Sequence, residues 1–150
     1  LAARKADGQL TFDIDLALSK SSENPVYYIQ YAHARICSVF RQLQEQDLTY
    51  DQKLGLDNLD LLTNDFEKAL LDRITKFPEI VAAAANALET HMVAHYLREL
   101  ANDFHSYYNG EKFIVESAEL RNARLCLVSA AKQVLVNGLD LLAVNAPEKM

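Results

Sequence analysis

The sequence predicts an all-α fold, an antiparallel bundle of five to six helices. Its 150 residues include only four glycines and three prolines, while Ala, Leu, Glu and Gln, which favour helix, are common. Apolar residues recur three or four positions apart, and no segment alternates between apolar and polar residues as a strand does. Half of the residues are apolar, which is enough for one domain with a sizeable core.

We expect the chain to divide into a linker segment, residues 1–20, and a helical domain, residues 21–150. The linker segment should end in a short helix that starts near Asp13. Asn24 is a good N-cap and Pro25 is tolerated in a first helical turn. The first long helix is therefore expected to begin at this pair.

The first long helix should end near residue 46, where the composition changes. Residues 47–58 are polar and contain Gly55, so we expect a loop there. A short turn then precedes a helix capped by Thr63 or Asn64. The remaining helices are expected over three ranges: 78–88, 89–109, and 118 to about 145.

One face of the first long helix carries two phenols and a guanidinium. At about 100° per residue, Tyr28, Tyr31 and Arg35 fall within one narrow sector. Flat rings and Arg suit unpaired RNA bases, which stack on them and accept hydrogen bonds from the guanidinium. Tyr at helical spacing is also typical of the core, so the spacing alone leaves both readings open. A separate apolar stripe is expected to pack inside; it consists of Ala32, Ile36, Val39 and Leu43.

Three separated motifs resemble the anticodon-binding domain of bacterial arginyl-tRNA synthetases, a class I family. The helix motif is Asn-Pro-Val-Tyr-Tyr-Ile-Gln-Tyr-Ala-His-Ala-Arg, residues 24–35. Residues 4–17 resemble the segment that leaves the family's catalytic domain. Residues 120–142 and 146–150 resemble the C-terminal part of the family's sequences. The family's Asp-Ala-Leu-Arg motif is only partly kept, as Ala-Glu-Leu-Arg at residues 118–121.

The resemblance implies a domain that recognises the anticodon stem and loop of arginine tRNA. The parent enzyme would ligate arginine to this tRNA with ATP, in the cytoplasm and as a monomer. Neither class I nucleotide-binding signature, His-x-Gly-His or Lys-Met-Ser-Lys-Ser, occurs in the sequence. We therefore expect no catalytic residue and no cofactor in this chain, with ATP and magnesium bound by a catalytic domain elsewhere in the parent.

The resemblance also carries over the contact residues. Candidates for the anticodon loop are Tyr28, Gln30, Tyr31, Arg35, Phe104, Tyr108 and Met150. The aromatic pair before Asn109-Gly110 has an alternative role, closing a helix end on the bundle. Candidates for phosphate contacts are Arg121, Arg124 and Lys132, for which solvated charge is the alternative. His33 lies off the aromatic sector and is expected to be packed inside.

The net charge of −6 is unusual for an RNA-binding chain. Residues 45–72 hold eight acidic and two basic residues, so the rest of the chain sums to zero. We expect this acidic segment to face away from any phosphate. The isolated chain should therefore bind RNA weakly.

Two other classes of function stay open at this point. A helical protein–protein interaction module would have all its aromatic residues in the core, so exposure of Tyr28, Tyr31 and Tyr108 on one surface distinguishes the two. A metal enzyme would use His91 and His95, four residues apart. However, Met92 stands where a zincin needs Glu, so we predict no metal.

The remaining signals point to a protein outside the membrane with reduced thiols. Cys37 and Cys126 lie on predicted apolar faces and are expected to be free thiols. No apolar run approaches the roughly 20 residues of a membrane span.

Overall fold

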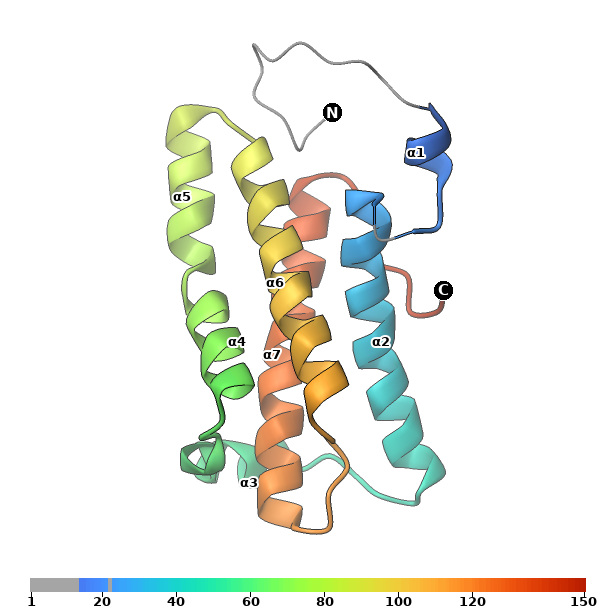
Figure 1. The fold of residues 1–150 in the computed structure, drawn as a ribbon. Coiled ribbons are helices and arrows are strands. Elements are labelled where there is room, and N and C mark those ends of the chain that lie inside the picture. Colours follow the sequence, from blue (N-terminus) through green and yellow to red (C-terminus); the bar gives the residue numbers. More distant parts are fainter. Residues whose placement is uncertain (1–13, 22) are drawn as a thin grey trace.

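The computed structural model describes residues 14–21 and 23–150. Every regular element within these residues is helical, which confirms the all-α class. Five helices have at least 11 residues, and two short helices and one 3-10 turn complete the fold (Figure 1). In chain order they are α1 (Ile14–Leu18), α2 (Pro25–Glu45), α3 (Gln52–Asp57), η1 (Leu59–Leu61), α4 (Asp65–Thr75), α5 (Phe77–Ala87), α6 (His91–Gly110) and α7 (Ala118–Leu141).

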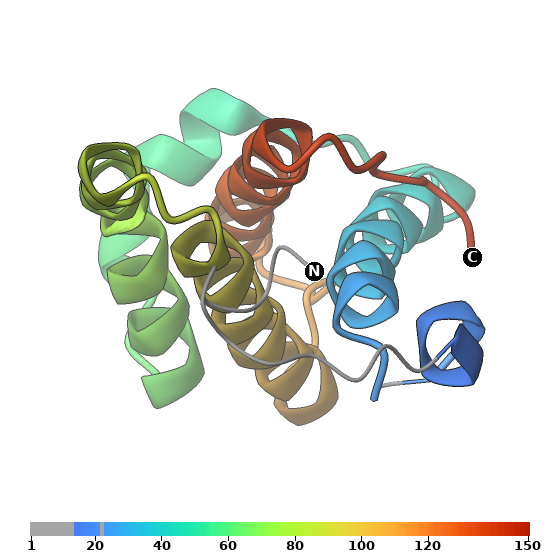
Figure 2. The same cartoon turned by 90° about the horizontal axis from the view of Figure 1, so that it is seen from above.

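The long helices α6 and α7 form the centre of the bundle. Helix α2 packs against both on one side, and α4 packs against both on the other (Figure 2). Helix α5 follows α4 end to end and packs on α6. Helix α7 runs antiparallel to α2 and α6, which point in the same direction (Figure 1). The acidic segment, residues 45–72, begins at the last residue of α2, and only its final part, residues 65–72, lies on α4, across the two central helices from α2.

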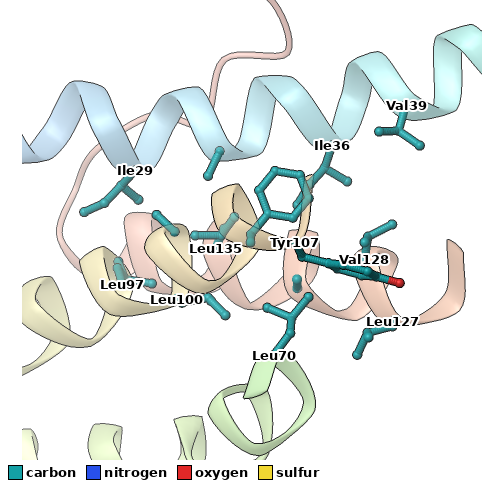
Figure 3. Close-up of a cluster of buried hydrophobic side chains, with 14 of the residues drawn as sticks. Ile29, Ile36, Val39, Leu70, Leu97, Leu100, Tyr107, Leu127, Val128 and Leu135 are labelled. Atoms are coloured by element: carbon teal, nitrogen blue, oxygen red, sulfur yellow. The ribbon is translucent and has the colours of Figure 1, made fainter. Parts of the chain in front are cut away.

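Helix α2 forms where its local signals predict. The Asn24 side chain accepts hydrogen bonds from the backbone N–H groups of Val26 and Tyr27, and Pro25 occupies the first turn, where it needs no N–H partner. Figure 3 shows Ile29 and Ile36 pointing from α2 into the core. The predicted apolar stripe is buried, with at most 2% exposure for Ala32, Ile36, Val39 and Leu43.

The loop predicted over residues 47–58 contains a helix instead, α3. Asp51 caps it by accepting a hydrogen bond from the Leu54 N–H at 2.9 Å. Gly55, which suggested a loop, is buried because α3 lies directly on α7. A Cβ at this position would collide with the backbone carbonyl oxygen of Asn122. The glycine therefore permits close helix packing rather than a turn.

The ends of the other helices combine expected and unexpected features. Asn64 and Glu67 form a complete capping box at the start of α4. Helix α7 continues through Gly138, but it ends at Leu141, earlier than predicted. Ala143 follows with a φ of 55°, a left-handed conformation that stops the helix.

Cys37 and Cys126 are free thiols.

The predicted linker lies mostly outside the described residues. Its short helix is present as α1, Ile14–Leu18. Most of the motif over residues 4–17, namely residues 4–13, lies outside the part of the chain that the structure describes.

Candidate nucleic-acid interface

The Arg35 guanidinium lies between two tyrosine rings, one on each of two neighbouring helices. Its central carbon is 4.7 Å from the ring centre of Tyr31 on α2 and 4.5 Å from that of Tyr108 on α6. Cations at such distances are attracted by the electron-rich ring faces, by about 0.5–2 kcal/mol per pair. The two rings therefore hold the guanidinium at the surface between α2 and α6.

His105 of α6 holds this arrangement from below. Arg35 Nη1 lies 3.3 Å from His105 Nδ1, and because a guanidinium has only donors, Nδ1 accepts. The ring proton is then on Nε2, which donates to the backbone carbonyl of Tyr28 at 3.4 Å. His105 is buried, and this burial lowers its pKa, in keeping with a neutral ring. The imidazole thus ties α2 to α6 directly under the site.

The C-terminal tail, residues 143–150, passes beside α2 (Figure 2), and side chains of that helix hold it through hydrogen bonds. Val144 and Ala146 pack against the core. Buried His33 is packed inside, as predicted, and its Nδ1 is 2.8 Å from a tail carbonyl. The three hydrogen-bonded pairs are Gln30 with Asn145, His33 with Pro147, and Arg41 with Glu148. They bring the last residues of the tail to the Arg35 site.

A surface concavity of about 420 Å³ opens beside the guanidinium; we call it the Arg35 concavity. Arg35, Arg41 and Lys149 contribute three positive charges to its lining, and among the residues that the structure describes no Asp or Glu side chain belongs to it. Met150, which is 51% exposed, closes one side. In a chain with a net charge of −6, this is a local region of positive potential. Its lining consists of Tyr31, Ala34, Arg35, Ser38, Arg41, Tyr108, Lys149 and Met150.

The predicted loop-binding residues do not all meet in this concavity. Tyr31, Arg35, Tyr108 and Met150 do. Tyr28 is half-buried beside them; its ring packs on His105 at 4.6 Å between ring centres, and burial raises its pKa.

Two other candidates have structural partners instead. The Gln30 amide donates to the backbone and side-chain oxygens of Asn145, both at 2.9 Å, so it serves the tail. Phe104 is fully buried and stacks on Phe113, which excludes the predicted contact with RNA. The four-residue spacing of Phe104 and Tyr108 correctly predicts that both lie on the same face of α6, but only Tyr108 reaches the surface.

One of the three predicted phosphate contacts needs correction, that of Arg124. Arg124 is buried and donates to the Glu67 carboxylate at 2.9 Å and to the Lys112 carbonyl at 2.6 Å. Arg121 donates to the carbonyl of Val115 at 2.8 Å, in the turn before α7. Both guanidinium groups therefore brace the 111–117 connection. Arg124 is too deeply buried to reach a phosphate, whereas Arg121 is half-exposed and its phosphate contact stays a prediction. Lys132 is half-exposed on α7 and does not line the Arg35 concavity.

The structure bears on the two rival functions. Tyr28, Tyr31 and Tyr108 are all half-exposed around one site, whereas a module with core aromatics would bury them. His91 lies near Glu89, at 3.6 Å. Within residues 14–21 and 23–150, no group of three His, Cys, Asp or Glu side chains is arranged to hold a metal ion. None of the described helices is long and apolar enough to cross a membrane.

Three residues of the site were missed by the sequence reasoning. His105 is a single histidine in a helix, and its spacing of three from Tyr108 gives it no distinctive motif. Arg41 lies on α2 six residues beyond Arg35, and Lys149 lies in the tail. Only the course of the tail along α2 brings these last two charges together.

Comparisons with known proteins identify the family. A family model for the DALR anticodon binding domain matches residues 29–150. An arginine–tRNA ligase of Coxiella burnetii (strain RSA 331 / Henzerling II) is 54% identical over 147 residues, which cover 98% of this chain and 25% of that relative. An arginine–tRNA ligase of Legionella pneumophila (strain Corby) is 55% identical over 148 residues, which cover 99% of this chain and 25% of that relative.

Solved structures agree with these relatives. The Thermus thermophilus arginyl-tRNA synthetase superposes with a TM-score of 0.74 and 33% identity, covering 93% of this chain and 23% of that chain. A Campylobacter jejuni structure, assigned as an arginyl-tRNA synthetase, superposes with a TM-score of 0.82 and is 32% identical in sequence. The match covers 99% of this chain and 32% of that chain. The chain spans about a quarter of the length of the curated relatives it matches. From the family match over most of its length and the agreement in fold, it follows that this chain belongs to the DALR anticodon binding domain family.

Proposed function

We propose that this chain recognises the anticodon stem and loop of arginine tRNA, as the C-terminal domain of an arginine–tRNA ligase. The family match and the names of the relatives support this assignment. The observation that carries it is the Arg35 guanidinium, held against the rings of Tyr31 and Tyr108 and facing a concavity whose described lining has no carboxylate side chain. Such a site offers ring faces for stacking and fixed donors for a base edge.

The arrangement favours one unstacked base. The guanidinium is already oriented by its two rings and by His105, so little ordering is required when a base arrives. Cytosine presents two adjacent acceptors on its pairing edge, which match donors of a planar guanidinium. The resemblance to the synthetase family implies that this base is the middle cytosine of the arginine anticodon, and we propose that it occupies the Arg35 concavity. Arg41 and Lys149 would interact with the neighbouring phosphates.

In the proposed parent enzyme, a separate catalytic domain binds ATP and magnesium and forms the ester bond to arginine. This chain supplies recognition rather than chemistry. The parent would act as a monomer in the cytoplasm. The catalytic domain would also supply much of the attraction for the RNA, because this chain alone has a net charge of −6.

The test is a titration of the chain with the anticodon stem-loop of arginine tRNA and with the same stem-loop carrying another middle base. The affinities are measured at two salt concentrations. The arginine stem-loop should bind about tenfold more tightly than the altered one, because replacing the middle base removes one stacked and hydrogen-bonded base. Arg35→Ala should abolish this preference. Arg35→Lys keeps the charge but not the planar donors, so it should lose the preference and retain the salt dependence. Equal binding of both stem-loops by the wild-type chain would refute the assignment.

A further inference from the structure

The segment that contains α3 and η1 exposes leucine side chains that the core does not use. Leu56, Leu59 and Leu61 are 52%, 42% and 39% exposed, and they are three of the eleven exposed large apolar residues in the described ranges. None of the three residues of η1 is buried. A single exposed leucine is common on a protein surface, whereas a cluster of them within one short segment marks an interaction site.

Acidic side chains lie among these leucines. Asp51, Asp57 and Asp60 are exposed, and Lys53, the only base in residues 51–61, is paired with Asp57 at 2.8 Å. Asp60 forms no ion pair with any residue that the structure describes. We call residues 51–61 the Leu59 surface. It belongs to the acidic segment, residues 45–72, whose charges sum to −6, so its potential is negative.

A broad concavity of about 600 Å³ adjoins the Leu59 surface. Leu56 contributes an exposed apolar side chain to its lining, and Asp51 and Asp57 contribute two carboxylates. The surface is therefore not flat, and it offers apolar and acidic groups side by side. A partner with apolar residues flanked by basic ones would complement both kinds of group.

The Leu59 surface is held firmly against α7. The backbone N–H of Asp51 donates to the side-chain oxygen of Asn122 at 2.7 Å, and Gly55 lets α3 lie directly on the backbone of Asn122. The side chain of Asn58 donates to the Leu54 carbonyl at 2.9 Å, which closes the end of α3. Because these contacts order the segment in the free protein, a partner would bind with little further ordering.

Charge and position select the kind of partner. RNA and anionic lipid would be repelled by the exposed acids, and a second copy of this chain would bring the same acids face to face. Figure 1 shows α3 at the opposite end of the bundle from α1, on the side of α7. The Leu59 surface shares no residue with the described lining of the Arg35 concavity, so we expect that both can be occupied together.

We propose that the Leu59 surface binds a basic amphipathic helix of another protein, with apolar residues on one face and lysine or arginine residues beside them. The apolar face would cover the three leucines, and the basic residues would meet Asp51, Asp57 and Asp60. A helix is favoured over an extended segment because none of the described elements is a strand whose edge could pair with it. This inference does not depend on the proposed RNA function.

The experiment uses a synthetic helical peptide of about five turns, with leucines at the helical period and lysines elsewhere. It is titrated into the full chain, and backbone amide chemical shifts locate the binding site. We expect the shifts to change over residues 49–61. A peptide of the same composition in shuffled order has no apolar face and should bind about tenfold more weakly.

Variants of the chain test the two parts of the surface. Leu59→Ser combined with Leu61→Ser should weaken peptide binding about tenfold, and it should not lower the melting temperature because neither residue is buried. Leu88→Ser is the matched control, because Leu88 is 90% exposed at the end of α5. Asp60→Asn should weaken binding about threefold, the value of one exposed ion pair, and Glu79→Gln on exposed α5 should not.

Four results would overturn the proposal. The first is an absence of peptide binding, and the second is equal binding of the ordered and shuffled peptides, which would mean attraction by charge alone. The third is displacement of the arginine stem-loop by the peptide, which would place the peptide at the Arg35 concavity. The fourth is a molecular mass that rises with chain concentration in the wild type but not in the double leucine variant, which would identify a second copy as the occupant. Stem-loop affinity should be unchanged in that variant, so the proposed function is tested separately.

Discussion

Arg35 and His105 form a hydrogen bond between α2 and α6 in which the histidine must be the acceptor. The two nitrogens are 3.3 Å apart, and the imidazole is buried at 6% exposure. A protonated His105 would have no lone pair for Arg35 and would place a second positive charge beside it. The geometry of the site therefore depends on a neutral ring.

This dependence predicts how stability changes with pH. Burial lowers the pKa of His105 below its ordinary value of 6.5, so the unfolded chain takes up the proton first as the pH falls. The stabilisation is complete above 6.5 and is lost as the pH falls toward the lowered value, by at most about 1.4 kcal/mol per pH unit. Urea unfolding should show this loss in the wild-type chain. The loss should be smaller in His105→Gln, which has no titrating ring; identical pH profiles would contradict the prediction.

A second prediction concerns which part of Tyr31 matters. Its hydroxyl forms no hydrogen bond with any described residue, whereas its ring packs on Arg35 at 4.7 Å. Tyr31→Ala should therefore reduce affinity for the arginine stem-loop by about 1–3 kcal/mol, and Tyr31→Phe should stay close to wild type. Thermal melting of the free chain should be little changed by Tyr31→Phe. A large loss in Tyr31→Phe would show that the hydroxyl takes part in recognition.

A third prediction concerns Met150 at the edge of the Arg35 concavity. Deletion of Met150 should lower RNA affinity by about 0.3–1.5 kcal/mol, the range for a thioether against an aromatic ring. It should not lower the melting temperature, because the hydrogen bonds that hold the tail come from residues before it. Calorimetric melting and stem-loop titration measure the two effects separately. Unchanged affinity would remove Met150 from the site.

A fourth prediction follows from the corrected role of Arg124. Glu67 accepts hydrogen bonds from Arg124 and Tyr107 in the core, so Glu67→Ala removes the buried one of the two carboxylates that pair with Arg124 and leaves the Tyr107 hydroxyl without its acceptor. We expect a loss of about 3–5 kcal/mol in the free energy of unfolding. Asp57→Ala, which removes an exposed pair with Lys53, should change it little. Similar urea midpoints for the two variants would show that the buried pair does not stabilise the fold.

Some features of the fold could be predicted because their causes are local. The N-cap Asn24 and the first-turn Pro25 define the start of α2, and the helical period identifies its buried stripe. Asn109-Gly110 correctly indicates the end of α6. These signals depend on neighbours within one or two turns, which a sequence displays directly.

Other features depend on packing between distant segments and were not predictable. Gly55 is typical of a loop in the sequence, and only the close packing of α3 on α7 explains why a glycine is needed there. Phe104 and Tyr108 share a helix face, but only the depth of the core decides that one is buried and the other reaches the surface. Arg124 resembles a free surface charge until Glu67, from a different helix, is found beside it.

The placement of α4 across the bundle from α2 has a consequence for encounters with nucleic acid. Residues 45–72 account for all of the net charge of −6, while Arg35 and Arg41 of α2 line one concavity together with Lys149. The charge is therefore unevenly distributed over the molecule. In the field of a polyanion it experiences a torque that turns its electropositive side forward, so productive orientations are enriched before contact even though the molecule as a whole is repelled.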